Sequence, residues 1–307
     1  MNKIYTTNLE KISADQLEGI RKQYSKDVMS LLEVNEEDAK HITEKTTAFL
    51  RDYCKNFGFK GYVIGLSGGI DSSISATLAV KAVGKEKVYG MLLPSKFTAQ
   101  NHINDALEVA KKLGIRVNDF EKVKQYFDSA IELTMLMTEV DKTHPNHSML
   151  LGNNHARERM KILRGKAASL NYLVLGTTNR TEAWLGYATI AGDGYKGVDI
   201  EPILMLPKTS ERKYAKFIGI PEQVIAKAPT AGLWEGQTDE GEIGMTYEDI
   251  DRVMTGKLIG LNAQEIEFAN KKPSIHKKSI ETIISRAKSN EFKAIPEPFA
   301  DLGRLQL

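Results

Sequence analysis

Four short apolar runs, separated by segments of helical length, organise the first two thirds of the chain. The runs are continuous in apolar residues rather than alternating with polar ones, which is typical of strands buried on both faces. The predicted strands are residues 62–66, 87–93, 114–119 and 172–177. The predicted helices beside them are residues 36–57, 72–83, 101–113, 123–138 and 151–170. This alternation predicts an α/β fold in which helices cover both faces of a parallel sheet.

The ends of the chain follow a different pattern. Residues 1–35 are polar and weakly patterned, which predicts an N-terminal arm or short helices before a single domain of residues 36–307. After Glu182, the stretches 186–200 and 229–246 are rich in glycine and acidic residues and have little periodicity, so we expect mobile loops over an active site. Helical periodicity returns at residues 246–256, 262–270 and 274–289.

Composition and charge narrow the class of protein. The 307 residues are 41% hydrophobic, which is enough for a proper core, and 42 Lys and Arg against 40 Asp and Glu give no charge excess that favours nucleic acid or a membrane as partner. No apolar run approaches the ~20 residues of a membrane span, and the first residues lack an apolar signal segment. We therefore expect a soluble cytoplasmic protein. The single cysteine, Cys54, excludes a disulfide framework within the chain and is expected to be a buried structural thiol.

The first apolar run leads directly into a loop of serine and glycine. Residues 65–73 read GLSGGIDSS, so a strand is followed by a glycine turn and a helix, the order in which backbone N–H groups are presented to phosphate. Gly68 and Gly69 let a phosphate approach the backbone closely. The lysine of the common NTPase loop is absent. Asp71 would repel a polyphosphate unless a magnesium ion lay between them, so the loop predicts a magnesium-dependent nucleotide site.

The motif SGGIDSS resembles the pyrophosphate loop of the N-type ATP pyrophosphatases. Three further stretches resemble the ammonia-dependent NAD synthetases within that family: GNNHARERM (152–160), GTTNRTEAWLGYATIAGDG (176–194) and KAPTAGLWEGQTDEGEIGMTYEDID (227–251). The resemblance implies a Rossmann-like fold of the adenine nucleotide alpha hydrolase type. It also implies that ATP is cleaved between its α and β phosphates, which explains the missing lysine because no γ-phosphoryl group is transferred.

The resemblance also implies which residues form the site. ATP would contact Gly65, Leu66, Ser67, Gly68, Gly69, Ile70, Asp71, Ser72, Ser73, Thr177, Lys208 and Thr230. The Mg²⁺ ligands would be Asp71 and Glu182, and the catalytic set would be Asp71, Glu182 and Lys208. The acceptor substrate would be bound by Arg157, Asp199 and Lys293. Catalysis would then rest on alignment and on charge neutralisation by magnesium, Lys208 and backbone N–H groups.

The implied reaction has two steps. The nicotinate carboxylate of deamido-NAD attacks the α phosphorus of ATP to give an acyl adenylate and pyrophosphate, and ammonia then displaces AMP to give NAD. A glutaminase-linked form would need a nucleophilic cysteine in an extra domain, and Cys54 lies in a predicted helix before the first strand. Free ammonia, or ammonia delivered by another protein, is therefore the expected donor. Because the family binds its dinucleotide at a dimer interface, the resemblance implies a homodimer.

Two departures from the family pattern fall on the acceptor side. The family run TKYGDG or TKWGDG has a lysine where this chain has Ile190, and Phe292 stands where the family's SEHKRR run has histidine, although Lys293 is retained. These departures leave open a paralogous ligase that amidates a different carboxylate through the same adenylate. A nucleotide-binding sensor without turnover is a further alternative, disfavoured because Asp71 and Glu182 are intact. A tRNA-thiolating enzyme is disfavoured because the chain lacks a basic surface and a set of reactive cysteines.

Overall fold

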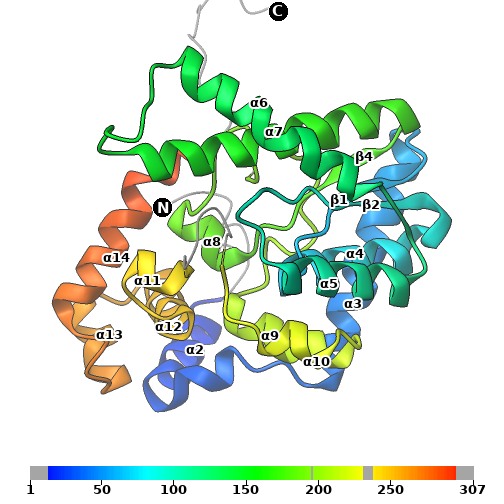
Figure 1. Cartoon of the computed structure of the whole chain (residues 1–307). Helices are drawn as coiled ribbons and strands as arrows, with labels where there is room; N and C mark the ends of the chain where they lie inside the picture. Colours follow the sequence, from blue (N-terminus) through cyan, green and yellow to red (C-terminus); the bar gives the residue numbers. More distant parts are fainter. Residues whose placement is uncertain (1–12, 195, 231–237, 295–307) are drawn as a thin grey trace, which may run out of the picture.

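A four-stranded parallel sheet lies at the centre of the computed structural model, which describes residues 13–194, 196–230 and 238–294 (Figure 1). The strands are β1 (Tyr62–Gly65), β2 (Val88–Met91), β3 (Arg116–Val117) and β4 (Leu173–Leu175). Their order in the sheet is β3-β2-β1-β4, and every neighbouring pair is parallel. The predicted parallel sheet is therefore confirmed. The strand predicted at 114–119 pairs only through its two residues of β3.

Helices cover both faces of this sheet, as the apolar pattern predicted (Figure 1). The helices around the sheet are α3 (Glu36–Asn56), α4 (Ile70–Val83), α5 (Gln100–Leu113), α6 (Phe120–Met137), α7 (His147–Leu170), α9 (Lys208–Phe217) and α10 (Glu222–Ala226). Helix α7 packs against β1 and β4 on one face, and α4 packs against β1 and β2 on the other. Short 3₁₀ turns lie at η2 (Val28–Leu31), η3 (Lys85–Lys87) and η4 (Glu291–Lys293).

Strand β1 shows why its sequence is apolar throughout. Val63 belongs to the apolar cluster under α7, which also contains Met160 and Leu163. Its neighbours Tyr62 and Ile64 belong to the larger cluster on the opposite face. Because successive side chains point to opposite faces of a strand, a strand covered on both sides has no position for a polar residue.

A second group of helices packs beside the sheet and completes one side of the site. Its members are α2 (Ala14–Asp27), α8 (Arg180–Leu185), α11 (Asp239–Ile243), α12 (Tyr247–Leu258), α13 (Ala263–Asn270) and α14 (Lys277–Ser289). Tyr24 of α2 is buried, and its hydroxyl donates to the carbonyl of Arg252 at 2.8 Å. Residues 14–31, placed in an N-terminal arm by the sequence pattern, thus pack on α12 and α13. The division at residue 35 stays a prediction.

No helix in the described ranges combines the length and apolarity needed to cross a bilayer.

Cys54 is buried in α3, as expected, and its thiol donates to the carbonyl of Phe59 at 3.1 Å. The turn that follows α3 therefore uses the cysteine as a local hydrogen-bond donor.

Candidate active site

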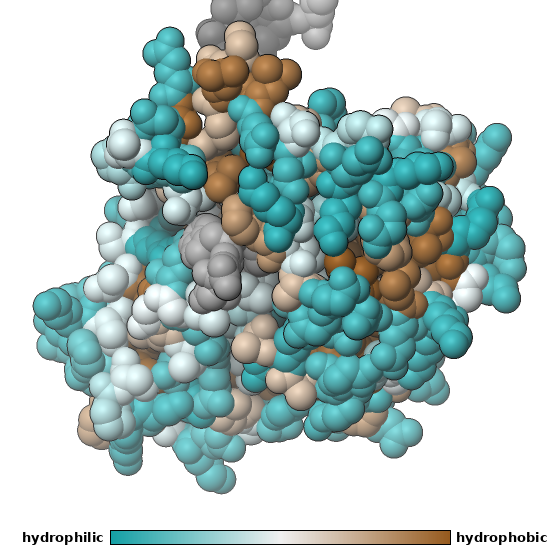
Figure 2. Space-filling view, viewed as in Figure 1, coloured by the Kyte–Doolittle hydropathy of each residue, from teal (hydrophilic) through white to brown (hydrophobic). Residues whose placement is uncertain are grey.

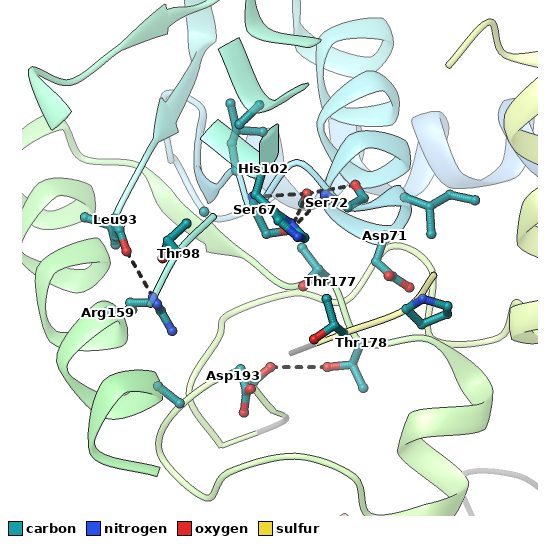
Figure 3. Close-up of a pocket in the computed structure, with 18 of the residues that line it drawn as sticks. Ser67, Asp71, Ser72, Leu93, Thr98, His102, Arg159, Thr177, Thr178 and Asp193 are labelled. Carbon is teal, nitrogen blue, oxygen red and sulfur yellow. Dashed lines mark hydrogen bonds between the residues drawn. The ribbon is translucent and has the colours of Figure 1, made fainter. Parts of the chain in front are cut away.

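A cavity of about 460 Å³ opens beyond the carboxyl ends of β1, β2 and β4. Its walls come from the loops that follow these strands, from the start of α9 and from residues 224–230. Ligands of open parallel sheets bind at this edge because the loops there converge from several strands. Figure 3 shows the labelled side chains of the serine-glycine loop, the turn after β4 and α7 surrounding the cavity.

The serine-glycine loop after β1 is held by its own hydroxyls. The Ser67 hydroxyl accepts from the backbone N–H of Gly69 at 3.2 Å, and the hydroxyls of Ser72 and Ser73 donate to the Gly69 carbonyl at 3.1 and 2.8 Å. Gly69 is the N-cap of α4 and provides no side-chain cap, so no side chain occupies the N–H groups of the first turn. These groups face the cavity and can bind an anion.

Gly68 shows why this loop needs glycine. Its φ is +74°, and an added Cβ would lie 2.2 Å from the carbonyl oxygen of His102 at the start of α5. Any other residue would be both strained and in collision with backbone. Close packing of α5 against the loop is therefore part of the site.

Asp71, Glu182 and Lys208 meet at the floor of the cavity, although they come from three distant parts of the sequence. The Lys208 ammonium lies 2.7 and 2.5 Å from the two carboxylate oxygens of Asp71 and 3.4 Å from Glu182. The side chain of Asn179, the N-cap of α8, donates to Asp71 at 2.9 Å and also accepts from the N–H of Glu182. The capping of α8 thus fixes Glu182 beside Asp71.

A third carboxyl group, Glu211, lies on the buried side of this cluster. It is fully buried on α9, one turn after Lys208, and its nearer oxygen is 3.5 Å from the Lys208 ammonium. The sequence alone did not assign it to the site. The signal that could have found it was its i,i+3 spacing from Lys208, which places the two side chains on one face of a helix.

The charges of the cluster are strongly coupled. Burial opposes the charge on Lys208, but the carboxylates of Asp71, Glu182 and Glu211 outweigh it and hold the pKa of the lysine well above its usual value. Burial raises the pKa of Glu182 to about 8, and Asp71 and Asp239 add to the rise while Lys208 opposes it. Burial also raises the pKa of Glu211 well above its usual value. Glu182 and Glu211 therefore hold protons near neutral pH, and a cation bound beside them would lower their pKa values.

Asp251 of α12 supports the cluster from behind. This fully buried carboxylate accepts from the Thr181 hydroxyl of α8 and, at 2.8 Å, from the N–H of Thr209 in α9. The Thr181 hydroxyl in turn accepts from the N–H of Lys208 at 3.0 Å. The two helices that carry Glu182 and Lys208 are thereby held to α12.

The residues predicted to contact ATP fall at or beside the cavity. The lining includes Gly65, Leu66, Ser67, Gly69, Ile70, Asp71, Ser72, Thr177, Glu182, Lys208 and Thr230. Gly68 and Ser73 support the loop from outside this lining. The structure therefore brings the nucleotide half of the predicted set together; the roles of the individual residues stay predictions.

The three residues predicted to bind the acceptor do not line this cavity in the single chain. Arg157 is exposed on α7 and its guanidinium donates to the Ile190 carbonyl at 3.3 Å. Asp199 is ion-paired with Arg164 and accepts from the N–H of Val174 at 2.7 Å. The Lys293 ammonium donates to the carbonyls of Gly186 and Ala188 at 2.8 and 3.1 Å. All three hold the 186–200 segment, and their predicted contacts with substrate remain untested.

Several lining residues were not assigned to the site from the sequence. They are His102, Arg159, Thr178, Asp193, Arg212, Lys227 and Asp239. Arg159 donates to the Leu93 carbonyl at 3.1 Å (Figure 3). Its guanidinium also lies over the ring of Phe127, 5.4 Å from the ring centre. Nothing local in the sequence separates Arg159 from Arg157, because only the direction of α7 decides which of the two faces the cavity.

Comparisons with known proteins match most of the chain to one family. The family model described as NAD synthase matches residues 42–296. The chain is 38% identical over 268 residues to the NH(3)-dependent NAD(+) synthetase of Methanocaldococcus jannaschii, covering 87% of this chain and 98% of that protein. It is 40% identical over 241 residues to the enzyme of the same name from Carboxydothermus hydrogenoformans, covering 78% and 94%.

Two solved structures show the same fold. The NMN synthetase of Francisella tularensis superposes with a TM-score of 0.71 at 32% identity, covering 86% of this chain and 99% of that one. The NH3-dependent NAD synthetase of Campylobacter jejuni, in complex with the nitrate ion, superposes with a TM-score of 0.68 at 29% identity, covering 86% and 100%. The fold, the strand-end cavity and these similarities agree, and the chain belongs to the NAD synthase family.

Proposed function

We propose that this protein is an ATP-dependent ligase that amidates the nicotinate carboxylate of deamido-NAD with ammonia, giving NAD, AMP and pyrophosphate. Family membership over most of the chain supports a C–N bond-forming ligase. The observation that carries the proposal is the convergence of the serine-glycine loop with Asp71, Glu182 and Lys208 at one strand-end cavity. This arrangement suits the release of pyrophosphate from ATP, because N–H donors and a buried ammonium both face the departing charge.

The side chains contribute binding and charge rather than covalent chemistry. The open N–H groups at the start of α4 and the Lys208 ammonium stabilise negative charge that builds on the β and γ phosphates. The acceptor carboxylate displaces pyrophosphate at the α phosphorus, and ammonia then attacks the acyl carbon of the adenylate while AMP leaves with the bonding electrons. Holding the two reactants in line accounts for much of the rate in such a step.

The Mg²⁺ ion belongs to the proposal and fits the residues present. Among the described residues no three His, Cys, Asp or Glu side chains form a metal site by themselves. Mg²⁺ commonly takes only one or two carboxylates and completes its shell with phosphate oxygens and water. Asp71 and Glu182 fit that requirement, because both line the cavity, the pKa of Asp71 is lowered beside Lys208 so that it keeps its charge, and a bound cation would favour the charged form of Glu182. The ion would neutralise the leaving pyrophosphate.

Two carboxylic acids are candidates for the acceptor substrate. A relative of known structure is an NMN synthetase, so a smaller acid, nicotinate mononucleotide, is an alternative acceptor for the same adenylate chemistry. Ile190 is 38% exposed and Phe292 is 52% exposed, and both stand where the family pattern has polar residues. Deamido-NAD remains the leading acceptor. The alignments to the curated NH(3)-dependent NAD(+) synthetases span nearly the whole length of those proteins.

A homodimer is proposed as the working form. Helix α6 exposes Tyr126, Leu133, Leu136 and Met137, and Met149 at the start of α7 is also exposed. Figure 2 shows apolar residues gathered at the top of the molecule, where α6 ends. A second copy of the chain would bury this face. Free ammonia as donor and a cytoplasmic location stay predictions.

The test of the proposed function is a product analysis with purified protein. ATP, Mg²⁺ and ammonia are combined with deamido-NAD, nicotinate mononucleotide or unrelated carboxylates, and AMP, pyrophosphate and the amide are measured. The expected result is one AMP and one pyrophosphate for each NAD formed. Release of ADP in place of AMP would exclude the adenylate route, and amide formed only from the mononucleotide would select the second candidate.

A further inference from the structure

Glu201 lies directly behind the turn that follows β4. The chain that returns from residues 187–199 runs beside β4, where Ile200 forms a parallel bridge with Leu175. Glu201 then turns its partly buried side chain under Gly176. An added Cβ on Gly176 would lie 2.2 Å from the Glu201 carboxyl oxygen, so a side chain at position 176 would displace this carboxyl group.

Both hydrogen-bond donors of Thr178 are directed at this one carboxyl group. The Thr178 N–H donates to Glu201 at 3.0 Å and its hydroxyl donates at 2.7 Å. The same hydroxyl lies 3.4 Å from the carbonyl oxygen of Asp193, the contact drawn in Figure 3. Thr178 is 4% exposed and lines the cavity together with Asp193.

We propose that Glu201 is a positioning residue: through Thr178 it joins the turn after β4 to the loop of Asp193, and thereby sets the part of the cavity lined by Thr178 and Asp193, where we place the acceptor. The carboxyl group itself does not line the cavity, so its effect passes through Thr178 and through its charge. This inference rests on the proposed amidation of a carboxylate.

The charge of Glu201 gives the proposal a distinct signature. Within the described residues the groups that act on its carboxyl are the Thr178 donors and the carboxylate of Asp193, and no cation is among them. Burial raises the pKa of Glu201 to about 8, with Asp193 adding to the rise and Thr178 opposing it. Asp193 itself faces Arg159 of α7 and Lys293. Above pH 8, Glu201 becomes a second negative charge beside Asp193, which disfavours an anionic acceptor.

The effect of Glu201 on acceptor binding can be isolated by measuring exchange between ATP and pyrophosphate. This exchange depends on the acceptor carboxylic acid but needs no ammonia. The KM for deamido-NAD is measured from pH 7 to pH 9 in wild type, Glu201→Gln, Glu201→Ala and the control Glu44→Gln on the exposed face of α3. We expect the wild-type KM to rise about fivefold over this range, the scale of a single charge acting through a partly buried site. Glu201→Gln can accept from the Thr178 N–H and donate to the Thr178 hydroxyl without carrying a charge. Since Glu182 titrates in both proteins, the KM of this variant for deamido-NAD should rise less than that of wild type, and its KM for ATP should be unchanged.

The variants separate positioning from folding and from the proposed function. Glu201→Ala should raise the acceptor KM at every pH, and Glu44→Gln should follow wild type. A KM for Glu201→Gln that rises as in wild type rejects the role of Glu201 while leaving the amidation intact. Absence of exchange in the wild type with either nicotinate acid rejects the proposed function instead.

A readout without turnover keeps the inference testable in every case. In protein labelled with ¹³C at the glutamate carboxyl carbon, we expect a resonance that titrates near pH 8, disappears in Glu201→Gln and shifts in Thr178→Val. Because Glu182 also has a pKa of about 8, Glu182→Gln identifies the second such resonance. If no titrating signal is lost in Glu201→Gln, the inference is wrong.

Discussion

Replacing Lys208 with methionine removes a buried positive charge while keeping most of the side-chain volume. Lys208 is 3% exposed and lies within 3.5 Å of Asp71, Glu182 and Glu211. At an effective dielectric constant of about 20, the Asp71 carboxylate at 2.7 Å interacts with the ammonium by about 6 kcal/mol, before desolvation is subtracted. Removing one partner of a buried pair typically costs about 3–5 kcal/mol. We expect a loss of unfolding free energy of that size.

The same substitution should reduce pyrophosphate release by about 10²–10³-fold, the usual effect of losing one preorganised group that faces developing charge. Stability is measured by denaturant unfolding without ligand, and turnover by pyrophosphate release at saturating ATP. Lys216→Met is the matched control, because Lys216 lies on the same helix with 62% of its side chain exposed and its ion pair with Glu222 is a surface one.

A double variant separates the two effects. Lys208→Met combined with Asp71→Asn removes both charges of the closest pair, so it should regain much of the lost stability but none of the turnover. If Lys208→Met retained turnover within threefold of wild type, the assignment of Lys208 to the leaving group would be wrong. If the double variant were no more stable than Lys208→Met, the electrostatic account of the cluster would be wrong.

Three further substitutions test the loop, the nitrogen donor and the assembly. Gly68→Ala should abolish ATP binding, measured by calorimetry, because its Cβ would lie 2.2 Å from the His102 carbonyl oxygen. Gly58→Ala is the control: its φ is +72° but the space around it is open, so it should cost only about 1 kcal/mol of backbone strain. Cys54→Ser should lower the unfolding free energy by about 1 kcal/mol, because a hydroxyl replaces the sulfur inside an apolar cluster. Ammonia-dependent turnover should stay within twofold because the thiol is structural, and a lost turnover would contradict that role. Leu136→Asp, at a position 73% exposed on α6, should give a folded monomer by light scattering, and a monomeric wild type would overturn the proposed dimer.

The nucleotide half of the site was predictable because its residues lie in short local motifs. A strand, a glycine turn and a helix start are all encoded within residues 62–73, and hydrogen bonds within the turn join neighbours in the chain. Glu182 was assigned through the family resemblance, and the structure shows that it lies three residues after Asn179, the residue that caps α8.

The acceptor half could not be predicted in the same way. Arg157 and Arg159 are indistinguishable by residue type, and the orientation of α7 against the sheet places Arg159 at the cavity and Arg157 outside its lining. Residues 14–31 were predicted only as an arm or short helices because most of their pattern is polar. Tyr24 packs on α12 and α13, which lie more than 200 residues later in the chain.

The amino-acid sequence by itself determined the alternation of strands and helices, the phosphate-binding turn and the identity of the charged residues near it. These depend on apolar periodicity and on hydrogen bonds between residues close in the chain. Only the tertiary structure decided that Asp71 and Lys208, 137 residues apart, share one ion pair, and that Glu182, Glu201 and Glu211 hold protons more tightly than exposed glutamates do. The physical reason is that a carboxyl group's charge is set by burial and by its spatial neighbours, and both are supplied by segments distant in sequence.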